Sequence, residues 1–143
     1  CMCDLRISGE SGRYGVPINR LGFAIAYDEL EAVLPLTGRA VALQMMVEGR
    51  VWEAAEALAK GLLTRVVPDA RLEEEAYASA RRIAEGAPLV NRWHKRFVRR
   101  LAVGPAPLTE AEIGENFAYF ATEDYRIGMD AFSNKKKPKF VGR

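Results

Sequence analysis

Histidine and cysteine are scarce in this sequence, which has one histidine, His94, and two cysteines, Cys1 and Cys3. Two cysteines that lie two positions apart cannot supply the framework of a disulfide-dense secreted domain. They also make a poor zinc site, because tetrahedral zinc takes four clustered ligands and only one histidine is present. We therefore predict no metal site and a reducing, cytoplasmic location.

Long hydrophobic runs and a strong net charge are also lacking. The longest apolar runs, such as 40–43 and 45–47, are far shorter than the roughly 20 residues of a membrane-spanning helix. We therefore do not expect this chain to be a membrane protein. The formal net charge is +2, from 21 Lys and Arg against 19 Asp and Glu. This balance excludes a nucleic-acid-binding field over the whole surface, and we expect no nucleic-acid partner.

The composition is that of one globular domain or of part of a larger one. Of the 143 residues, 49% are hydrophobic and 28% are charged, which excludes a disordered or collagen-like chain. No basic segment followed by an apolar stretch opens the sequence, so we expect no secretory signal. The first residue is Cys1, and residues 1–5 resemble the middle of an element. We therefore expect the sequence to begin inside a longer chain.

The pattern along the chain runs from strands into helices. Residues 5–7 and 13–16 alternate in the manner of short strands, and the glycines and serines of 8–12 favour a turn between them. This arrangement predicts a β-hairpin-like pair that ends at Pro17. A helix is predicted over 24–34, stopped near Pro35, because its apolar residues permit one.

Glycine and proline divide the next segments. A helix is predicted over 39–48 and ends at Gly49. The alanine-rich segment 53–60 predicts another, and Gly61 separates it from a strand over 62–67. We expect Asp69 to cap a helix over about 71–85.

The remaining segments predict short amphipathic helices. A helix begins at Pro88, and its apolar stripe is expected to be buried (Leu89, Trp93, Phe97 and Leu101). Thr109 and Glu112 fit a capping box that opens a helix over 110–120, and Thr122 can cap the last helix, through about Phe132. Such one-sided apolar faces need a partner surface, from an absent segment or from another subunit.

Several ordered segments carry a family resemblance. Each one is weak alone, but their shared order and spacing extend over essentially all 143 residues. They resemble the enoyl-CoA hydratase/isomerase (crotonase) superfamily. The matching segments are Cys3-Asp4-Leu5-Arg6-Ile7, Tyr14-Gly15-Val16-Pro17, Leu21-Gly22, Gly38-Arg39-Ala40-Val41-Ala42-Leu43, Glu53-Ala54-Ala55-Glu56-Ala57-Leu58-Ala59-Lys60-Gly61-Leu62, Val66-Val67-Pro68, Phe120-Ala121-Thr122-Glu123-Asp124, Gly128-Met129-Asp130-Ala131-Phe132 and Lys135-Lys136-Lys137-Pro138-Lys139-Phe140.

The resemblance implies an α/β fold, a spiral of ββα units. Residues 1–68 would form the C-terminal part of the spiral core, and 69–143 a helical trimerisation region with a basic tail. The family assembles as trimers, often as a dimer of trimers. Its members bind acyl-CoA thioesters, need no cofactor besides the coenzyme A of the substrate, and stabilise an enolate-like oxyanion with two backbone N–H groups. By this resemblance both donors, and one of two catalytic glutamates, lie before the segment that matches Cys1.

The second catalytic glutamate of the family has no counterpart here. In hydratases it directly follows the proline of a Gly-x-Pro-Glu turn, and this sequence has Ile18 after Gly15-Val16-Pro17. Losing a positioned acid or base typically costs about 10²–10⁴-fold in rate, so ordinary hydration is doubtful. Other members place an aspartate about eight residues further on, where this sequence has Ala26. The usual glycine-rich helix start is replaced by 23–29.

Three neighbouring side chains are candidates for a substitute role. Asp28 and Glu29 are the candidate catalytic carboxylates, and Tyr27 joins Ile18 and Ala26 as a candidate substrate contact. Each carboxylate also has a structural interpretation, because acidic side chains in the first turn of a helix are favoured by its dipole. Tyr27 can equally be a packed ring with its hydroxyl at the surface.

The basic tail carries the candidate coenzyme A contacts. By the resemblance, Lys135 or Lys136 lies where the family presents a lysine to the CoA phosphates, and an ammonium can pair with phosphate as a point charge. Phe117 matches an aromatic residue near the adenine or pantetheine of a neighbouring subunit. The alternatives are a solvated charged tail and core packing of Phe117.

Other conspicuous residues are assigned structural roles and no catalytic ones. A basic group without acidic neighbours is interpreted as a solvated helix face, because Trp93 and Phe97 belong to the apolar stripe and do not alternate as stacking platforms. It comprises Arg92, Lys95, Arg96, Arg99 and Arg100. His94 is given no catalytic role, and Trp52 is expected to be a shielded ring.

Two functions are therefore left open. The first is a lyase or isomerase that acts on a CoA thioester with an acid/base different from the standard pair. The second is a non-catalytic crotonase-like paralogue that serves in trimer assembly or acyl-CoA binding.

Overall fold

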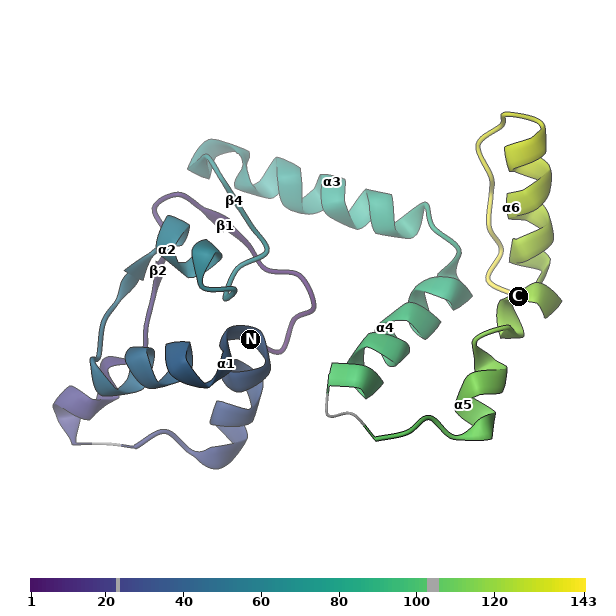
Figure 1. Cartoon of the computed structure of the whole chain (residues 1–143). Helices are drawn as coiled ribbons and strands as arrows, with labels where there is room; N and C mark the ends of the chain where they lie inside the picture. Colours follow the sequence, from purple (N-terminus) through teal and green to yellow (C-terminus); the bar gives the residue numbers. More distant parts are fainter. Residues whose placement is uncertain (23, 103–105) are drawn as a thin grey trace. The chain divides into compact units, whose positions relative to one another are not determined.

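The computed structural model describes residues 1–22, 24–102 and 106–143. The chain divides into two compact units, Cys1–Tyr77 and Ala78–Arg143 (Figure 1). Helix α3 (Leu72–Ala84) begins in the first unit and ends in the second. The predicted boundary after residue 68 stays a prediction.

The first unit contains two small sheets that join segments far apart in the sequence. Strand β1 (Ile7–Gly9) pairs in parallel with β4 (Arg65–Val67). Strand β2 (Arg13–Tyr14) pairs antiparallel with β3 (Trp52–Glu53). The predicted hairpin is therefore wrong, because the first two strands do not pair with each other. The Gly9–Gly12 turn forms, with the Gly12 N–H donating to the Gly9 carbonyl at 3.1 Å, but it leads the chain from one sheet to the other.

Helix α1 (Tyr27–Val47) consists of two helical segments separated at Gly38. Gly38 has φ 73° and ψ 168°, a backbone conformation that is nearly confined to glycine. The predicted stop at Pro35 is wrong, since Pro35 lies within the first segment. Among the described residues, α1 is the one helix that is long and apolar enough to cross a membrane, with a mean hydropathy of 1.3 in its most apolar window. The break at Gly38 leaves neither segment with the roughly 20 continuous residues of a span.

The core of the first unit is built around Trp52, whose side chain is fully buried. The buried residues that pack with it come from α1, from α2 (Ala54–Ala59) and from the link between α2 and β4. They are Met45, Ala54, Ala57, Leu62 and Leu63. The predicted shielded ring is confirmed. Small alanines on the buried face of α2 let this helix lie close against the indole.

Asp69 does not cap the helix that follows it. It opens a short 3₁₀ turn, η2 (Asp69–Arg71), whose N-cap is Pro68. Its carboxylate instead accepts hydrogen bonds from the backbone N–H and the hydroxyl of Ser11, at 3.2 and 2.9 Å. Asp69 therefore ties the end of β4 to the turn after β1, which the prediction of a local cap missed.

The second unit is helical. It contains α4 (Pro88–Ala102), α5 (Glu110–Glu115), the 3₁₀ turn η3 (Ala118–Ala121) and α6 (Glu123–Ser133). The capping box of Thr109 and Glu112 and the Thr122 cap are both confirmed. The helix that begins at Glu110 is shorter than predicted and ends at Glu115. The glycine and prolines of 104–107 predict a break in the chain, and this segment lies partly outside the described residues.

The apolar stripe of α4 is not buried as predicted. No side chain of this helix is buried, and Leu101 is 60% exposed. Trp93 and Phe97 are half-buried. The expected partner surface for this one-sided apolar face stays a prediction.

Candidate functional site

The turn that carries Ile18 is held tightly by its neighbours. A Cβ on Gly15 would lie 2.5 Å from the Arg50 carbonyl oxygen, so only glycine fits at this close approach. Pro17 then opens the short helix η1 (Pro17–Leu21), in which Ile18 is half-buried. The Asn19 amide donates to the Val47 carbonyl at 2.9 Å and ties η1 to the end of α1. Ile18 therefore occupies a fixed position and presents an aliphatic side chain there.

The other candidates of the first unit lie at the start of α1. Ala26 is the N-cap residue, and Tyr27 is the first helical residue, 93% exposed. Asp28 and Glu29 follow in the first turn and are also exposed. The Glu29 carboxylate accepts a hydrogen bond from the Ala26 backbone N–H at 3.1 Å, which satisfies a donor that the helix leaves free. Phe23, in the replaced glycine-rich segment, lies outside the described residues.

The chemistry available in this segment follows from its side chains. Ile18 and Ala26 cannot transfer a proton, whereas Asp28, Glu29 and Tyr27 each carry a titratable group. Glu29 already acts in the helix cap. The roles predicted for these five residues stay predictions.

The candidate coenzyme A residues of the second unit are exposed. Phe117 is 61% exposed, and its ring stacks on Phe120 with the centroids 6.4 Å apart. Lys135 and Lys136 form the turn after α6, where their backbone N–H groups donate to the carbonyls of Phe132 and Ala131, at 3.2 and 2.8 Å. Both side chains extend into solvent. Their contacts with coenzyme A stay predictions.

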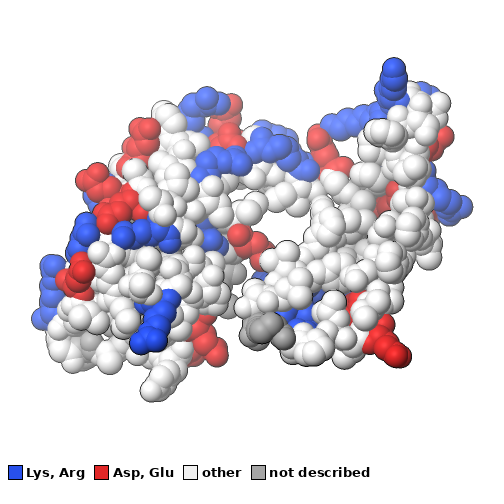
Figure 2. Space-filling model, in the orientation of Figure 1, with Lys and Arg blue, Asp and Glu red and all other residues white. Residues whose placement is uncertain are grey.

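The tail after this turn lies back along α6, and residues of both line a basic groove. The groove has a volume of about 480 Å³ and is open to solvent. Four cationic side chains line it, Arg126, Lys136, Lys137 and Lys139, together with two acidic ones, Glu123 and Asp130. Figure 2 shows Lys and Arg side chains gathered around the turn after α6. A surface of this kind suits a phosphate-bearing ligand.

The tail is anchored by Asp124, a residue that the sequence analysis missed. Its carboxylate is 1% exposed and accepts hydrogen bonds from the backbone N–H groups of Val141 and Gly142. Next to it, the Arg143 guanidinium donates to the Glu123 carboxylate at 2.7 Å, which raises the pKa of Arg143 further above its ordinary value. In the sequence, Asp124 resembles an ordinary acidic residue of a first helical turn. Its real partners are 17 and 18 positions away and give no local signal.

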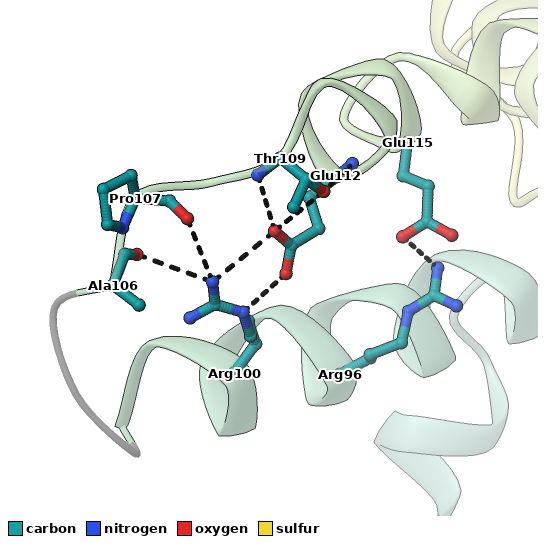
Figure 3. A network of polar contacts seen from close by, with 7 residues as sticks. All are labelled: Arg96, Arg100, Ala106, Pro107, Thr109, Glu112 and Glu115. Atoms are coloured by element: carbon teal, nitrogen blue, oxygen red, sulfur yellow. Dashed lines mark hydrogen bonds and ion pairs between the residues drawn. The ribbon is translucent and has the colours of Figure 1, made fainter.

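A second polar network joins α4 to α5 (Figure 3). The Arg100 guanidinium donates to the Glu112 carboxylate at 2.5 Å and to the carbonyls of Pro107 and Ala106, at 3.3 and 3.5 Å. Arg96 pairs with Glu115 at 2.7 Å. Two residues of the predicted basic face therefore meet acidic residues of the next helix, which the spacing along α4 alone did not reveal.

Glu112 is the acceptor at the centre of this network. The Thr109 backbone N–H donates to its carboxylate at 2.7 Å, and this bond, followed by the Arg100 guanidinium, lowers the pKa of Glu112. The ion-paired residues also line a cleft of about 220 Å³, together with the apolar side chains of Phe97, Leu101 and Leu108. The network stabilises the α4–α5 corner without bringing catalytic groups together.

The described residues include no group of three or more His, Cys, Asp or Glu side chains that could hold a metal ion. His94 is exposed on α4.

Known proteins match this chain along its whole length. The sequence profile of the enoyl-CoA hydratase/isomerase family matches residues 1–143. A crystal structure described as an enoyl-CoA hydratase/carnithine racemase from Magnetospirillum magneticum is 47% identical, with a TM-score of 0.94, and the match covers 99% of this chain and 52% of that one. The resemblance to crotonase-type α/β structures is thus confirmed.

Curated relatives agree with this match. A probable enoyl-CoA hydratase of Rhizobium meliloti is 36% identical, and one of Mycobacterium bovis is 34% identical. Each match covers 99% of this chain and 56% of the relative, so the chain spans about half the length of the relatives it matches. The chain belongs to the enoyl-CoA hydratase/isomerase family.

Proposed function

We propose that the protein carrying this chain is a lyase or isomerase that acts on an acyl-CoA thioester and lacks the standard second glutamate of hydratases. Membership of the family supports the thioester substrate. The observation that carries the proposal is Ile18, fixed in η1 directly after Gly15-Val16-Pro17. No cofactor besides the coenzyme A of the substrate is part of the proposal.

The chemistry requires a proton donor or acceptor near the acyl group. Hydration of an enoyl thioester adds water across a carbon–carbon double bond, so that one carbon receives a proton and the other a hydroxyl group. An aliphatic side chain can neither donate this proton nor accept one from the attacking water. We assign stabilisation of the enolate-like oxyanion to backbone N–H groups outside this chain. Asp28 or Glu29 is assigned the role of the substitute acid/base.

Binding of the coenzyme A portion is assigned to the second unit. Lys135 and Lys136 pair with its phosphates, and Phe117 packs near the adenine or pantetheine of a neighbouring subunit. Their exposure supports this role, because all three side chains are accessible to a ligand. The neighbouring subunit belongs to a trimer or a dimer of trimers.

Hydration of crotonyl-CoA by the full-length protein and two variants at Ile18 tests the proposal. Ile18→Glu supplies a carboxyl group at the fixed turn, and we expect it to raise the hydration rate about 10²-fold or more. Ile18→Gln is the matched control, since it has similar size and polarity without a transferable proton, and it should stay at the wild-type rate. Wild-type hydration as fast as that of a two-glutamate hydratase would contradict the proposed role of Ile18.

A non-catalytic role in acyl-CoA binding or trimer assembly is the second candidate. The same observation favours it, because a member that has lost its acid/base can keep the binding surface. Saturable acyl-CoA binding combined with the absence of hydration and isomerisation products would select this function over the first.

A further inference from the structure

Asp124 is a buried residue whose carboxylate, in the described part of the chain, accepts hydrogen bonds from the end of the tail. Its Oδ1 accepts from the Val141 N–H at 2.7 Å and from the Gly142 N–H at 3.1 Å, and its Oδ2 accepts from Gly142 at 3.0 Å. Burial of a carboxylate is costly unless it is paired or hydrogen-bonded. The tail therefore supplies the hydrogen bonds that the buried Asp124 carboxylate requires, and Asp124 in turn holds the tail in place.

The tail also accepts hydrogen bonds from the start of α6. The backbone N–H groups of Glu123 and Asp124 donate to the Arg143 carbonyl at 2.8 and 3.2 Å. These donors belong to the first turn of a helix and have no partner within it. Gly142 has φ 78°, a left-handed conformation that directs the chain into this contact. These contacts form a two-way latch between the start of α6 and residues 141–143.

The basic residues extend from a second anchor toward this latch. At the other end of α6, Lys136 N–H donates to the Ala131 carbonyl at 2.8 Å. Lys135 and Lys136 form the turn at this anchor, and Lys137 and Lys139 belong to the short segment that follows it. This tail runs back alongside α6 (Figure 1). Lys137 also pairs with the Glu85 carboxylate at 2.5 Å. The latch fixes the course of this segment along α6 before any ligand arrives.

We propose that Asp124 is a positioning residue that preorganises this lysine segment for the phosphates of coenzyme A. The inference rests on the function proposed above and deepens it. Lysine binds phosphate as a flexible point charge, so affinity depends on how much conformational freedom is lost on binding. A segment already fixed at both ends loses less freedom than a free tail.

The test compares two thioesters on the full-length protein. Crotonyl-CoA carries the nucleotide phosphates, whereas crotonyl-pantetheine has the same acyl group and arm without them. We expect Asp124→Asn to weaken binding of crotonyl-CoA about tenfold in calorimetry and to leave binding of crotonyl-pantetheine within about twofold. Hydrogen exchange of the C-terminal peptide should accelerate in the same variant, whereas exchange of α4 should not change.

Two further variants keep the test interpretable. Gly142→Ala strains the tail at φ 78° without changing the carboxylate, and we expect the same selective loss if Asp124→Asn does not fold. Glu115→Gln, the matched control, removes a carboxylate of α5 that is paired with Arg96, and both affinities should be unchanged.

The outcomes separate this inference from the function on which it rests. Equal losses for both thioesters would overturn the positioning role and leave Asp124 as a structural residue only. Unchanged affinity for crotonyl-CoA together with faster exchange of the tail would also overturn it. If the wild-type protein binds neither thioester, the proposed function itself fails.

Discussion

Trp52 shows how one side chain organises the first unit. It is fully buried, and its indole Nε1 has no hydrogen-bond partner in the described part of the chain. The Lys60 ammonium lies 5.1 Å from the centre of its ring, a cation–π distance. The ring therefore contributes through packing and through its π face, and its N–H contributes no hydrogen bond.

Two substitutions of Trp52 separate these contributions. Trp52→Ala should lower the free energy of unfolding by about 3–5 kcal/mol, because it leaves a cavity within the core. Trp52→Phe should cost less, about 2 kcal/mol or below, since it keeps a ring and breaks no hydrogen bond. Urea denaturation followed by circular dichroism measures both. Equal losses in the two variants would contradict this account, because they would show that a smaller ring recovers none of the stability.

At the scale of elements, Gly38 decides the shape of α1. Gly38→Ala should lower the free energy of unfolding by about 1–3 kcal/mol, because alanine is strained at φ 73° and ψ 168°. Space is no obstacle, as nothing lies within 4 Å of a Cβ at this position. Thermal denaturation provides the measurement.

The control for Gly38 is another glycine with an open environment. Gly114 lies in α5 and also has nothing within 4 Å of a Cβ. Gly114→Ala should stabilise by about 0.5–1 kcal/mol, as expected for a helical position. If Gly38→Ala stabilised the protein equally, α1 would be continuous in solution.

The capping box of α5 gives a pH-dependent stability. The pKa of Glu112 is lowered in the folded protein, so the unfolded chain binds the proton more readily. Its contribution is complete above the ordinary carboxyl pKa and is lost as the pH falls through the lower folded value. Melting temperatures across acidic pH should therefore decrease less steeply for Glu112→Gln than for wild type. Glu110→Gln, in the same turn, keeps the box and should follow the wild-type profile.

Local sequence signals predicted the helices and their caps, but they did not predict which distant segments pair. The Thr109 and Thr122 caps and the helix of 54–59 depend on neighbours within a few positions, so the sequence contains their cause. The partners of β1 and β2 are about 40 to 60 positions away. A hairpin was the nearest pairing available to local reasoning. Asp69 and Asp124 were misjudged or missed for the same reason, since their partners are distant in the sequence.

At the scale of the whole molecule, the second unit exposes large apolar side chains. Phe132 is 83% exposed on α6. Leu101 on α4 and Phe117 after α5 are also mostly exposed. Exposed apolar side chains of this number indicate a surface that is covered in the full protein, either by a segment outside this chain or by another subunit. Local periodicity predicted that such faces exist, whereas no feature of the sequence identifies the surface that covers them.

Self-association of the full-length protein is the corresponding prediction. Sedimentation should give the mass of a trimer or of a dimer of trimers, and Phe132→Asp and Leu101→Asp should shift it toward smaller species. The reason is that burial of an unpaired carboxylate in an apolar contact is costly. Met2→Asp changes an exposed apolar residue of the first unit and should leave the mass unchanged. A wild-type protein that sediments as a monomer would contradict the prediction.

Both proposed functions depend on one central claim, that the protein binds acyl-CoA. Calorimetric titration of the full-length protein with butyryl-CoA tests it most directly, because this saturated thioester offers no double bond to hydrate and separates binding from turnover. We predict saturable binding at one site per subunit that is weakened when Lys135 and Lys136 are both replaced by alanine. A titration without saturable heat, or binding that is indifferent to both lysines, would contradict the account.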